Sequence, residues 1–359
     1  MGGDTASTST AAESAPRLGM RVAVVEGDGI GQEVIPAAVR VLDALGLGLE
    51  FQSFDVGAER FLATGEAMPD SVYAEITAAD AILLGAIGDP RITVAGYSNS
   101  VLMRLRLGLD LFANVRPAQL FHERLSPLKN PDRRQVDLVV LRENTEGLYS
   151  GRGSRSEPGT EREIAIQEDY NTYTGVTRVI EYAFRIARTE VCMCDKWNAM
   201  PHVGALWQER FWAIAKRHPN LRARHMMIDA AALHLVQDPS HFDVIVTENC
   251  FGDILSDLAG GLAGGLGVAP SANLNPATSK GVFEPVHGSA PDIAGRGIAN
   301  PVAAILTAGL ALRHLGFEAE AVAIRNACRE AVRARECTRD LGGSLDTGQA
   351  AAAIIRRLP

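Results

Sequence analysis

The sequence has no long apolar run, no cysteine motif and no excess of positive charge. No stretch of its 359 residues reaches the roughly 18–20 apolar residues of a membrane-spanning helix. The five cysteines contain no C-x-x-C pair, and their odd number argues against a complete disulfide framework. A formal net charge of −8 provides no electrostatic basis for binding nucleic acid. We therefore expect a cytoplasmic protein that binds neither membranes nor nucleic acid.

The composition is ordinary for a globular protein, with 47% hydrophobic and 22% charged residues. The chain is long enough for two domains, or for one large core with an addition. Residues 1–18 are small and polar and lack the apolar segment of a signal peptide, so we predict a disordered tail there.

Short apolar runs of strand character alternate with helical patterns along much of the chain. We predict strands at 21–27, 49–56, 81–88, 136–144 and 242–250, and helices at 32–45, 71–79, 253–264 and 300–357. The segment 270–301 is rich in proline, glycine and asparagine and is predicted to be a functional loop. This alternation predicts an α/β fold with a largely parallel sheet.

The stretch VVEGDGIGQEV at residues 24–34 places three glycines between a strand pattern and a helix pattern. A dinucleotide fingerprint requires G-x-G-x-x-G, because its glycines let the backbone approach a pyrophosphate and let the helix pack closely. The spacing here is G-x-G-x-G, and no acidic residue is clearly placed for a ribose, with Asp55 lying 24 residues beyond Gly31. A tight turn is the favoured interpretation.

Acidic residues follow a predicted buried strand in ENCFGDILSD. Asp253 and Asp257 are four residues apart, so they share one helix face and can converge on a cation. The alternative is a solvated helix start, where aspartate is favoured by the helix dipole. Asp229 is a third acid in an apolar setting. Three carboxylates suit Mg²⁺ or Mn²⁺ better than zinc.

Three arginines lie in apolar or strand-like segments, namely Arg106, Arg116 and Arg142. Together they suggest a clamp for a carboxylate-rich substrate, although a single arginine of this kind commonly forms a structural salt bridge. Lys196 follows the apolar run VCMC and is either a general base or a surface lysine. Tyr149 is a candidate proton donor, with simple packing as the commoner alternative.

The stretch EPVHGSAPDIAGRGIANP contains the groups that an adenosine requires. His287 can stack on the adenine, the backbone amides of residues 288–290 can read its edge, and Asp292 can bind the ribose hydroxyls; Asn300 precedes a helix. A carboxylate at this place would repel a 2′-phosphate, which favours NAD over NADP.

These motifs, in this order, resemble the metal-dependent β-decarboxylating dehydrogenases, which include isopropylmalate, isocitrate, homoisocitrate, and D-malate or tartrate dehydrogenases. The resemblance runs from about residue 20 to the C-terminus. It is carried by GDGIGQEV, DLFANVRP, RENTEG with Tyr149 after it, DK-x-N, NCFGDILSD and FEPVHGSAPDIAGRGIANP.

The resemblance implies two α/β domains with a cofactor site unlike the Rossmann fold. Residues 19–111 and 264–359 would form a discontinuous cofactor-binding domain. Residues 112–263 would form the domain for substrate, metal and dimerisation, with an arm around 150–175. It also implies a homodimer with shared active sites, in which Lys196 and Asp229 are contributed by the other copy.

The resemblance also implies roles for individual residues. Arg106, Arg116 and Arg142 would bind the carboxylates of a 2-hydroxy dicarboxylate substrate. Tyr149, Lys196 and Asp229 would act in catalysis. Asp229, Asp253 and Asp257 would bind Mg²⁺ or Mn²⁺. The residues that the resemblance assigns to the binding of NAD are Glu284, His287, Gly288, Ser289, Ala290, Asp292, Ile293, Asn300, Asp340 and Asn198.

The group on C3 of the substrate would face the helix that precedes Arg106. Isocitrate enzymes have a Ser-x-Asn pattern there. Ser100 matches its serine, but Leu102 does not match its asparagine. Leu102 and Met103 resemble the apolar pair of isopropylmalate and D-malate enzymes. We expect NAD-dependent oxidative decarboxylation of 3-isopropylmalate or a related 3-alkylmalate. D-malate or tartrate, and isocitrate or homoisocitrate, stay as alternatives.

Two hypotheses of another kind fit the residues less well. A non-catalytic regulatory subunit should have lost the tyrosine, the lysine or a metal aspartate, and the sequence retains all of them. A metal-free 2-hydroxy acid dehydrogenase of the Rossmann type is disfavoured by the glycine spacing.

Overall fold

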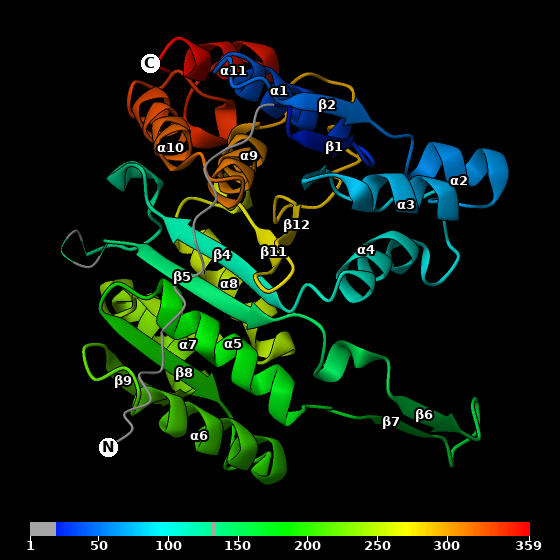
Figure 1. Ribbon diagram of the computed structural model, residues 1–359, viewed down its shortest axis with the longest axis vertical. Helices are drawn as coiled ribbons and strands as arrows, with labels where there is room; N and C mark the ends of the chain where they lie inside the picture. Colours follow the sequence, from blue (N-terminus) through cyan, green and yellow to red (C-terminus); the bar gives the residue numbers. More distant parts are fainter. Residues whose placement is uncertain (1–18, 131, 133) are drawn as a thin grey trace, which may run out of the picture.

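A computed structural model describes residues 19–130, 132 and 134–359 (Figure 1). The tail predicted at 1–18 lies outside the described residues. The strands are β1 (Arg21–Val25), β2 (Glu50–Ser53), β3 (Ala81–Leu84), β4 (Ala113–Gln119), β5 (Asp137–Glu143), β6 (Gly153–Ser156), β7 (Ile164–Gln167), β8 (Glu190–Asp195), β9 (Arg222–Met227), β10 (Val244–Thr247), β11 (Ala272–Asn275) and β12 (Lys280–Phe283). The α-helices are α1 (Gly31–Asp43), α2 (Ala58–Thr64), α3 (Asp70–Ala78), α4 (Tyr97–Gly108), α5 (Tyr173–Ile186), α6 (Pro201–Ala215), α7 (Ile228–Gln237), α8 (Asn249–Leu262), α9 (Val302–His314), α10 (Glu318–Arg333) and α11 (Thr347–Ile355).

A ten-stranded sheet runs through the molecule in the order β2-β1-β3-β12-β11-β4-β5-β10-β8-β9. β11 and β4 run antiparallel to their neighbours, and the other pairs are parallel. The predicted α/β fold with a largely parallel sheet is therefore confirmed. No helix in the described part of the chain is long and apolar enough to cross a membrane.

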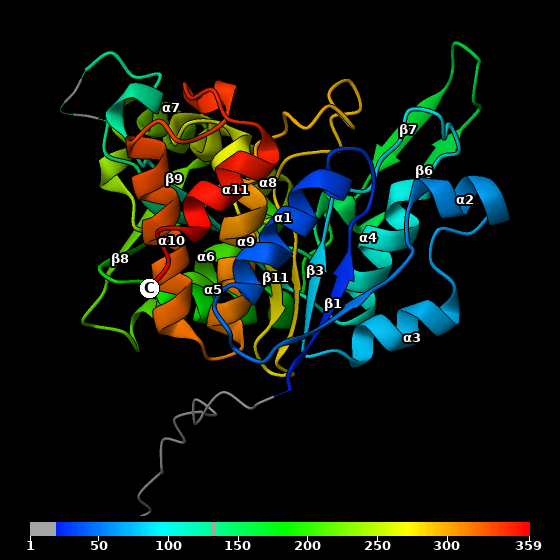
Figure 2. The same cartoon turned by 90° about the horizontal axis from the view of Figure 1, so that it is seen from above.

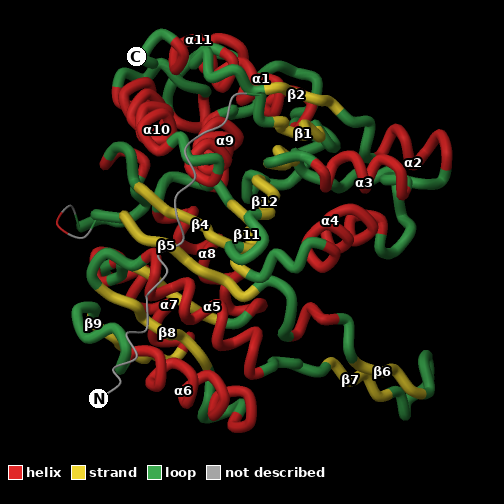
Figure 3. Tube along the Cα trace, viewed as in Figure 1, coloured by secondary structure: helices red, strands yellow, loops and turns green. Residues whose placement is uncertain are grey.

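The prediction of a loop at 270–301 is wrong in part, because β11 and β12 form a hairpin there and join the centre of the sheet (Figure 3). The asparagines that suggested a loop are buried and hydrogen-bonded. Asn114 and Asn144 each donate a hydrogen bond of 2.9 Å to the Asn273 side-chain oxygen. A buried amide is tolerated in a strand when it has such partners.

Helices cover both faces of the sheet (Figure 2), and alternation along the strands assigns side chains to each face. In β1, Val24 packs with the helices α1 and α9, whereas Val25 packs with α3 and α4. In β8, Met193 packs with α5 and α6, and Cys194 packs with α7 and α8. We call the side covered by α3, α4, α7 and α8 the α8 face, and the opposite side the α9 face.

The strands β6 and β7 form a separate antiparallel hairpin that projects from the body of the molecule (Figures 1 and 2). Its residues are exposed, including the apolar side chains of Ile164 and Ile166. The hairpin is anchored at its base, where Gly147 pairs with Tyr170.

The glycine-rich turn after β1 packs against the loop between β12 and α9. Gly29 has a φ of +55°, and a Cβ atom there would lie 2.0 Å from the carbonyl oxygen of Ser289. The amide of Ile30 donates a hydrogen bond of 2.8 Å to the same oxygen. The protein's own backbone thus fills the space that a fingerprint glycine leaves for a pyrophosphate. This packing agrees with a turn that is not a Rossmann fingerprint.

Asp28 holds this turn to three neighbouring segments. Its buried carboxylate accepts hydrogen bonds from the amide of Ala58 at 2.7 Å, the amide of Gly88 at 2.6 Å and the hydroxyl of Tyr97 at 2.8 Å. Tyr97 is the first residue of α4. Asp28 therefore sets the start of the helix that carries Ser100, Leu102 and Arg106.

The helix α8 begins directly after the buried strand β10. The side chain of Glu248 accepts hydrogen bonds from two amides in the first turn of the helix, at Cys250 and Phe251. Burial raises the pKa of Glu248 to about 7, although these backbone hydrogen bonds oppose the shift.

The clash at residue 29 predicts a large loss of stability for Gly29→Ala. Gly46 has a similar φ of +64°, but a Cβ atom there would have nothing within 4 Å, so Gly46→Ala serves as the control. We expect Gly46→Ala to lower the free energy of unfolding by ~1 kcal/mol through backbone strain alone. Gly29→Ala should cost at least ~3 kcal/mol, because the loop around Ser289 must move. Equal losses in urea unfolding would show that this contact is unimportant.

The raised pKa of Glu248 predicts a pH-dependent effect of Glu248→Gln. Between its usual pKa near 4.5 and its folded pKa near 7, the folded chain binds the extra proton, so the wild-type chain loses stability as the pH rises. Glutamine does not titrate. The melting temperature of the variant relative to wild type should therefore increase from pH 5 to pH 8. A difference that stays constant would contradict the shift.

Candidate active site

The three predicted arginines converge on the α8 face of the sheet. Arg116 and Arg142 come from the adjacent strands β4 and β5, and Arg106 comes from α4. Arg142 is nearly fully buried, and its Nε and Nη2 atoms donate hydrogen bonds of 2.9 Å and 2.8 Å to the side-chain oxygen of Asn249. Burial, followed by repulsion from Arg116, lowers the pKa of Arg142 to about 10. Both guanidinium groups therefore favour an anionic partner.

Two of the predicted metal-binding aspartates provide that partner. Asp253 forms an ion pair with Arg142, and its Oδ1 atom lies 3.2 Å from Nη1 of Arg116. Oδ1 of Asp257 lies 3.3 Å from the same nitrogen. The structure thus brings Arg116, Arg142, Asp253 and Asp257 together at the first turns of α8. Burial, together with repulsion from Asp253, raises the pKa of Asp257.

Tyr149 lies at the edge of this cluster, in the 3₁₀ turn Leu148–Ser150. Its hydroxyl is 3.5 Å from Oδ2 of Asp253, and the guanidinium carbon of Arg142 is 5.5 Å from the centre of its ring. Burial and the neighbouring Cys250 thiol raise the pKa of Tyr149 to about 12. The hydroxyl therefore stays protonated near neutral pH, as a proton donor requires.

Lys196 and Asp229 form a second, separate group. Nζ of Lys196, just after β8, lies 2.7 Å from Oδ1 of Asp229 at the start of α7. This contact lowers the pKa of Asp229. Within the described residues, neither side chain forms a hydrogen bond or ion pair with Asp253, Asp257 or Tyr149. The same residues contain no group of three or more histidine, cysteine or acidic side chains that could hold a metal ion.

The predicted cofactor residues lie in the loop after β12 and around it. Nε2 of His287 is buried without a hydrogen-bond partner, and burial lowers the pKa of this histidine. Asn300 donates a hydrogen bond of 2.8 Å to Asp340, which joins two predicted residues from distant segments. Asp292 is exposed.

The other residues assigned to the cofactor have different surroundings. Glu284 lies beside Arg106, with 3.5 Å between Oε2 and Nη2, and burial raises its pKa. Ile293 and Ala290 pack against the core of the α9 face. Gly288 is exposed, and the carbonyl of Ser289 contacts the glycine-rich turn. Asn198 is exposed in the turn after Lys196, away from this loop in the sequence.

The predicted specificity residues lie on α4. The hydroxyl of Ser100 donates a hydrogen bond of 2.6 Å to the carbonyl of Tyr97. Leu102 is partly buried against the core formed with α3, and Met103 is half-buried. Met103 and Arg106 are three residues apart, so they lie on neighbouring parts of the helix surface.

The sequence analysis missed two residues that hold the arginines in place. Asn249 accepts from Arg142, and the Ser256 hydroxyl accepts a hydrogen bond of 2.8 Å from Arg116. A signal for both exists in NCFGDILSD, where the residues flank Asp253 on the first turns of a helix. Their partners lie more than a hundred residues away, so the pairing itself cannot be derived from the pattern.

Known proteins are similar to this chain in sequence and in fold. The family model described as isocitrate/isopropylmalate dehydrogenase matches residues 21–354. A 3-isopropylmalate dehydrogenase of Rhodococcus opacus (strain B4) is 47% identical over 313 residues, which cover 86% of this chain and 92% of the relative. A 3-isopropylmalate dehydrogenase of Corynebacterium efficiens is 45% identical over 94% of this chain and 100% of the relative.

Solved structures are also similar to this chain in fold. The isocitrate dehydrogenase from Methylococcus capsulatus has a TM-score of 0.86 and 37% identity, and the match covers 94% of this chain and 99% of that chain. A β-decarboxylating dehydrogenase from Thermococcus kodakarensis has a TM-score of 0.79 and 36% identity, with 94% and 96% covered. The resemblance drawn from the motifs is confirmed, and this chain belongs to the isocitrate/isopropylmalate dehydrogenase family.

Proposed function

We propose that this chain catalyses the NAD-dependent oxidative decarboxylation of 3-isopropylmalate with Mg²⁺ or Mn²⁺. The observation that carries the proposal is the cluster of Arg116 and Arg142 with Asp253 and Asp257. It combines buried cations for the carboxylates of a substrate with carboxylates for a divalent cation. The identity of 45–47% to 3-isopropylmalate dehydrogenases supports the choice of substrate.

The arginines would orient the substrate. Arginine binds carboxylates through two parallel hydrogen bonds, so Arg106, Arg116 and Arg142 can hold the two carboxylates of a malate derivative in one orientation. The C3 substituent then faces Leu102 and Met103 on α4. Ser100 donates its hydroxyl hydrogen to the backbone of Tyr97. An apolar isopropyl group therefore fits this helix better than the carboxymethyl group of isocitrate.

Asp253 and Asp257 fit a hard divalent cation. Both carboxylates approach the same nitrogen of Arg116, so they lie on one side of α8, and their mutual repulsion contributes to the raised pKa of Asp257. Carboxylate oxygens are the ligands that Mg²⁺ and Mn²⁺ prefer. Asp229 from a second copy would complete the set. A bound cation would withdraw electron density from the C2 oxygen, which would acidify the hydroxyl and stabilise negative charge after loss of CO₂.

The loop around His287 fits the adenosine part of NAD. The unpartnered Nε2 of His287 and the Asn300–Asp340 pair provide polar groups for it. The carboxylate of Asp292 would repel the 2′-phosphate of NADP. NAD⁺ bound there would supply the acceptor for the hydride from C2.

Lys196 and Tyr149 would handle the protons. When hydride leaves C2, the Lys196–Asp229 pair would relay the proton of the C2 hydroxyl to solvent, and the product is a β-keto acid. This acid loses CO₂ from C3. Tyr149 then donates its proton to C3, which its raised pKa allows because the hydroxyl is still protonated at neutral pH.

We further propose a homodimer in which Lys196 and Asp229 complete the site of the other copy. These two side chains form no hydrogen bond or ion pair with Tyr149 or Asp253 in the described part of one chain. The adjacent helices α7 and α8 expose apolar side chains, namely Leu233, Val236 and Ile254. An exposed group of this kind is typical of a subunit interface.

The division into domains at residues 111 and 263 also stays a proposal. The separation of the core into clusters that belong mainly to one or the other part supports it.

The five cysteines are free thiols, as expected in the reducing cytoplasm that we propose for this protein.

A panel of substrates tests the proposed function. With NAD and Mg²⁺ or Mn²⁺, NADH should form fastest, by kcat/KM, from 3-isopropylmalate, compared with D-malate, tartrate, isocitrate and homoisocitrate. Excess chelator or Asp253→Asn should lower the rate at least ~10³-fold, because no cation then withdraws electron density from the C2 oxygen. Asp43→Asn, at the exposed end of α1, is the matched control variant. Full turnover in chelator, or a preference for isocitrate, would refute the assignment.

A further inference from the structure

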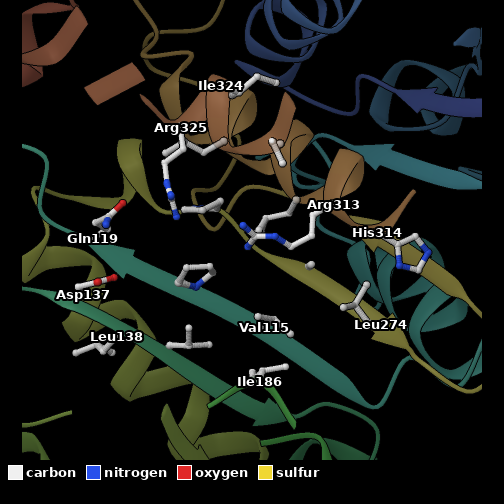
Figure 4. Close-up of a pocket in the computed structure, with 18 of the residues that line it drawn as sticks. Val115, Gln119, Asp137, Leu138, Ile186, Leu274, Arg313, His314, Ile324 and Arg325 are labelled. Atoms are coloured by element: carbon white, nitrogen blue, oxygen red, sulfur yellow. The ribbon is translucent and has the colours of Figure 1, made fainter. Parts of the chain in front are cut away.

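A large cavity lies on the α9 face of the sheet, opposite the candidate active site (Figure 4). Its volume is about 570 Å³, within the range of small-molecule sites. The walls come from β4, β5, β11, α5, α9 and α10. Side chains alternate along the strands, so Val115 and Pro117 face this cavity while Arg116, between them, faces α8. The two sites are therefore on opposite sides of the same strands.

Most of the cavity wall is apolar. Val115 and Leu274 contribute the floor from the sheet, and Leu306, Leu310 and Ile324 contribute from α9 and α10. This lining favours an apolar body for a bound molecule, because its transfer from water is stabilised by the hydrophobic effect.

The charges on the wall are unevenly compensated. Arg188 is paired with both acids of the lining, with Nη1 at 2.8 Å from Asp137 and Nε at 2.9 Å from Asp243. Arg313 is paired at 2.7 Å with Glu318, outside the lining. Arg325 has no hydrogen bond or ion pair among the described residues, and its Nε atom is buried without a partner.

The guanidinium group of Arg325 points into the cavity. Figure 4 shows the guanidinium groups of Arg313 and Arg325 reaching from α9 and α10 towards the sheet. Burial and repulsion from Arg313 lower the pKa of Arg325, although the charges of Asp137 and Glu318 oppose the shift. Arg325 is half-buried and its buried Nε atom has no partner, so an anion beside this guanidinium would be stabilised.

We propose that this cavity binds a small organic carboxylate with an apolar body. The carboxylate would form two parallel hydrogen bonds with Arg325, near Arg313. The apolar body would lie over Val115, Leu274 and Leu310. A single unpaired arginine and an apolar wall match a monocarboxylate better than a phosphate or a dicarboxylate.

Octanoate is a suitable probe, titrated into the full-length protein by isothermal calorimetry. We expect one saturable site per chain. Arg325→Gln should weaken the affinity at least tenfold. Arg329→Gln removes a charge one turn further along α10, outside the cavity lining, and should leave the affinity unchanged. Octan-1-ol has the same body without the charge and should bind at least tenfold more weakly than octanoate.

Several outcomes would overturn the proposal. These are the absence of saturable binding, an equal affinity for octan-1-ol, and an affinity that Arg325→Gln leaves unchanged. If excess 3-isopropylmalate with Mg²⁺ abolishes the binding, octanoate binds at the arginines of the active site instead. Leu310→Trp fills the cavity and should also prevent binding in a chain that melts like wild type. A change of oligomeric state in that variant would show that the face binds another copy of the chain.

Discussion

The ion pairs between Asp253 and the buried guanidinium groups of Arg116 and Arg142 determine the arrangement of the candidate active site. Two buried cations on neighbouring strands repel each other and require an anion close by. The helix α8 supplies that anion because it lies directly against β5, where a Cβ atom on Gly252 would come within 2.6 Å of the Cβ of Arg142. Glycine at 252 thus permits the close packing that brings Asp253 to the arginines.

The direction of these arginine side chains also determines which residues of the central strands lie on the opposite face of the sheet. The arginines of β4 and β5 point towards α8, so the residues between them point towards α9 and α10 and line the cavity there. The strands β11 and β12 complete the centre of the sheet, and the buried Asn114–Asn273–Asn144 hydrogen bonds hold β11 beside β4. In the loop between β12 and α9, the contact between Gly29 and Ser289 joins the first turn of the fold to the segment that contains His287.

Much of this arrangement could be predicted from the sequence. Hydrophobic patterns identified β1, β3, β5 and the helices after residue 300, and the motifs identified Arg116, Arg142 and Asp253. The strand β11 could not be predicted, because asparagine is unfavourable in a strand unless distant side chains accept and donate its hydrogen bonds. Asn249 and Ser256 were missed for a similar reason, since their roles depend on arginines from other strands.

The position of Lys196 and Asp229 leads to the central claim, that one active site requires two copies of the chain. The claim is tested by mixing two inactive variants, Asp253→Asn and Lys196→Ala, after unfolding and refolding them together. If sites are shared, a mixed dimer contains one site with both defects and one intact site. Random pairing should then restore about a quarter of the wild-type activity. Activity that stays at the level of the separate variants, although mixed dimers have formed, would contradict the claim.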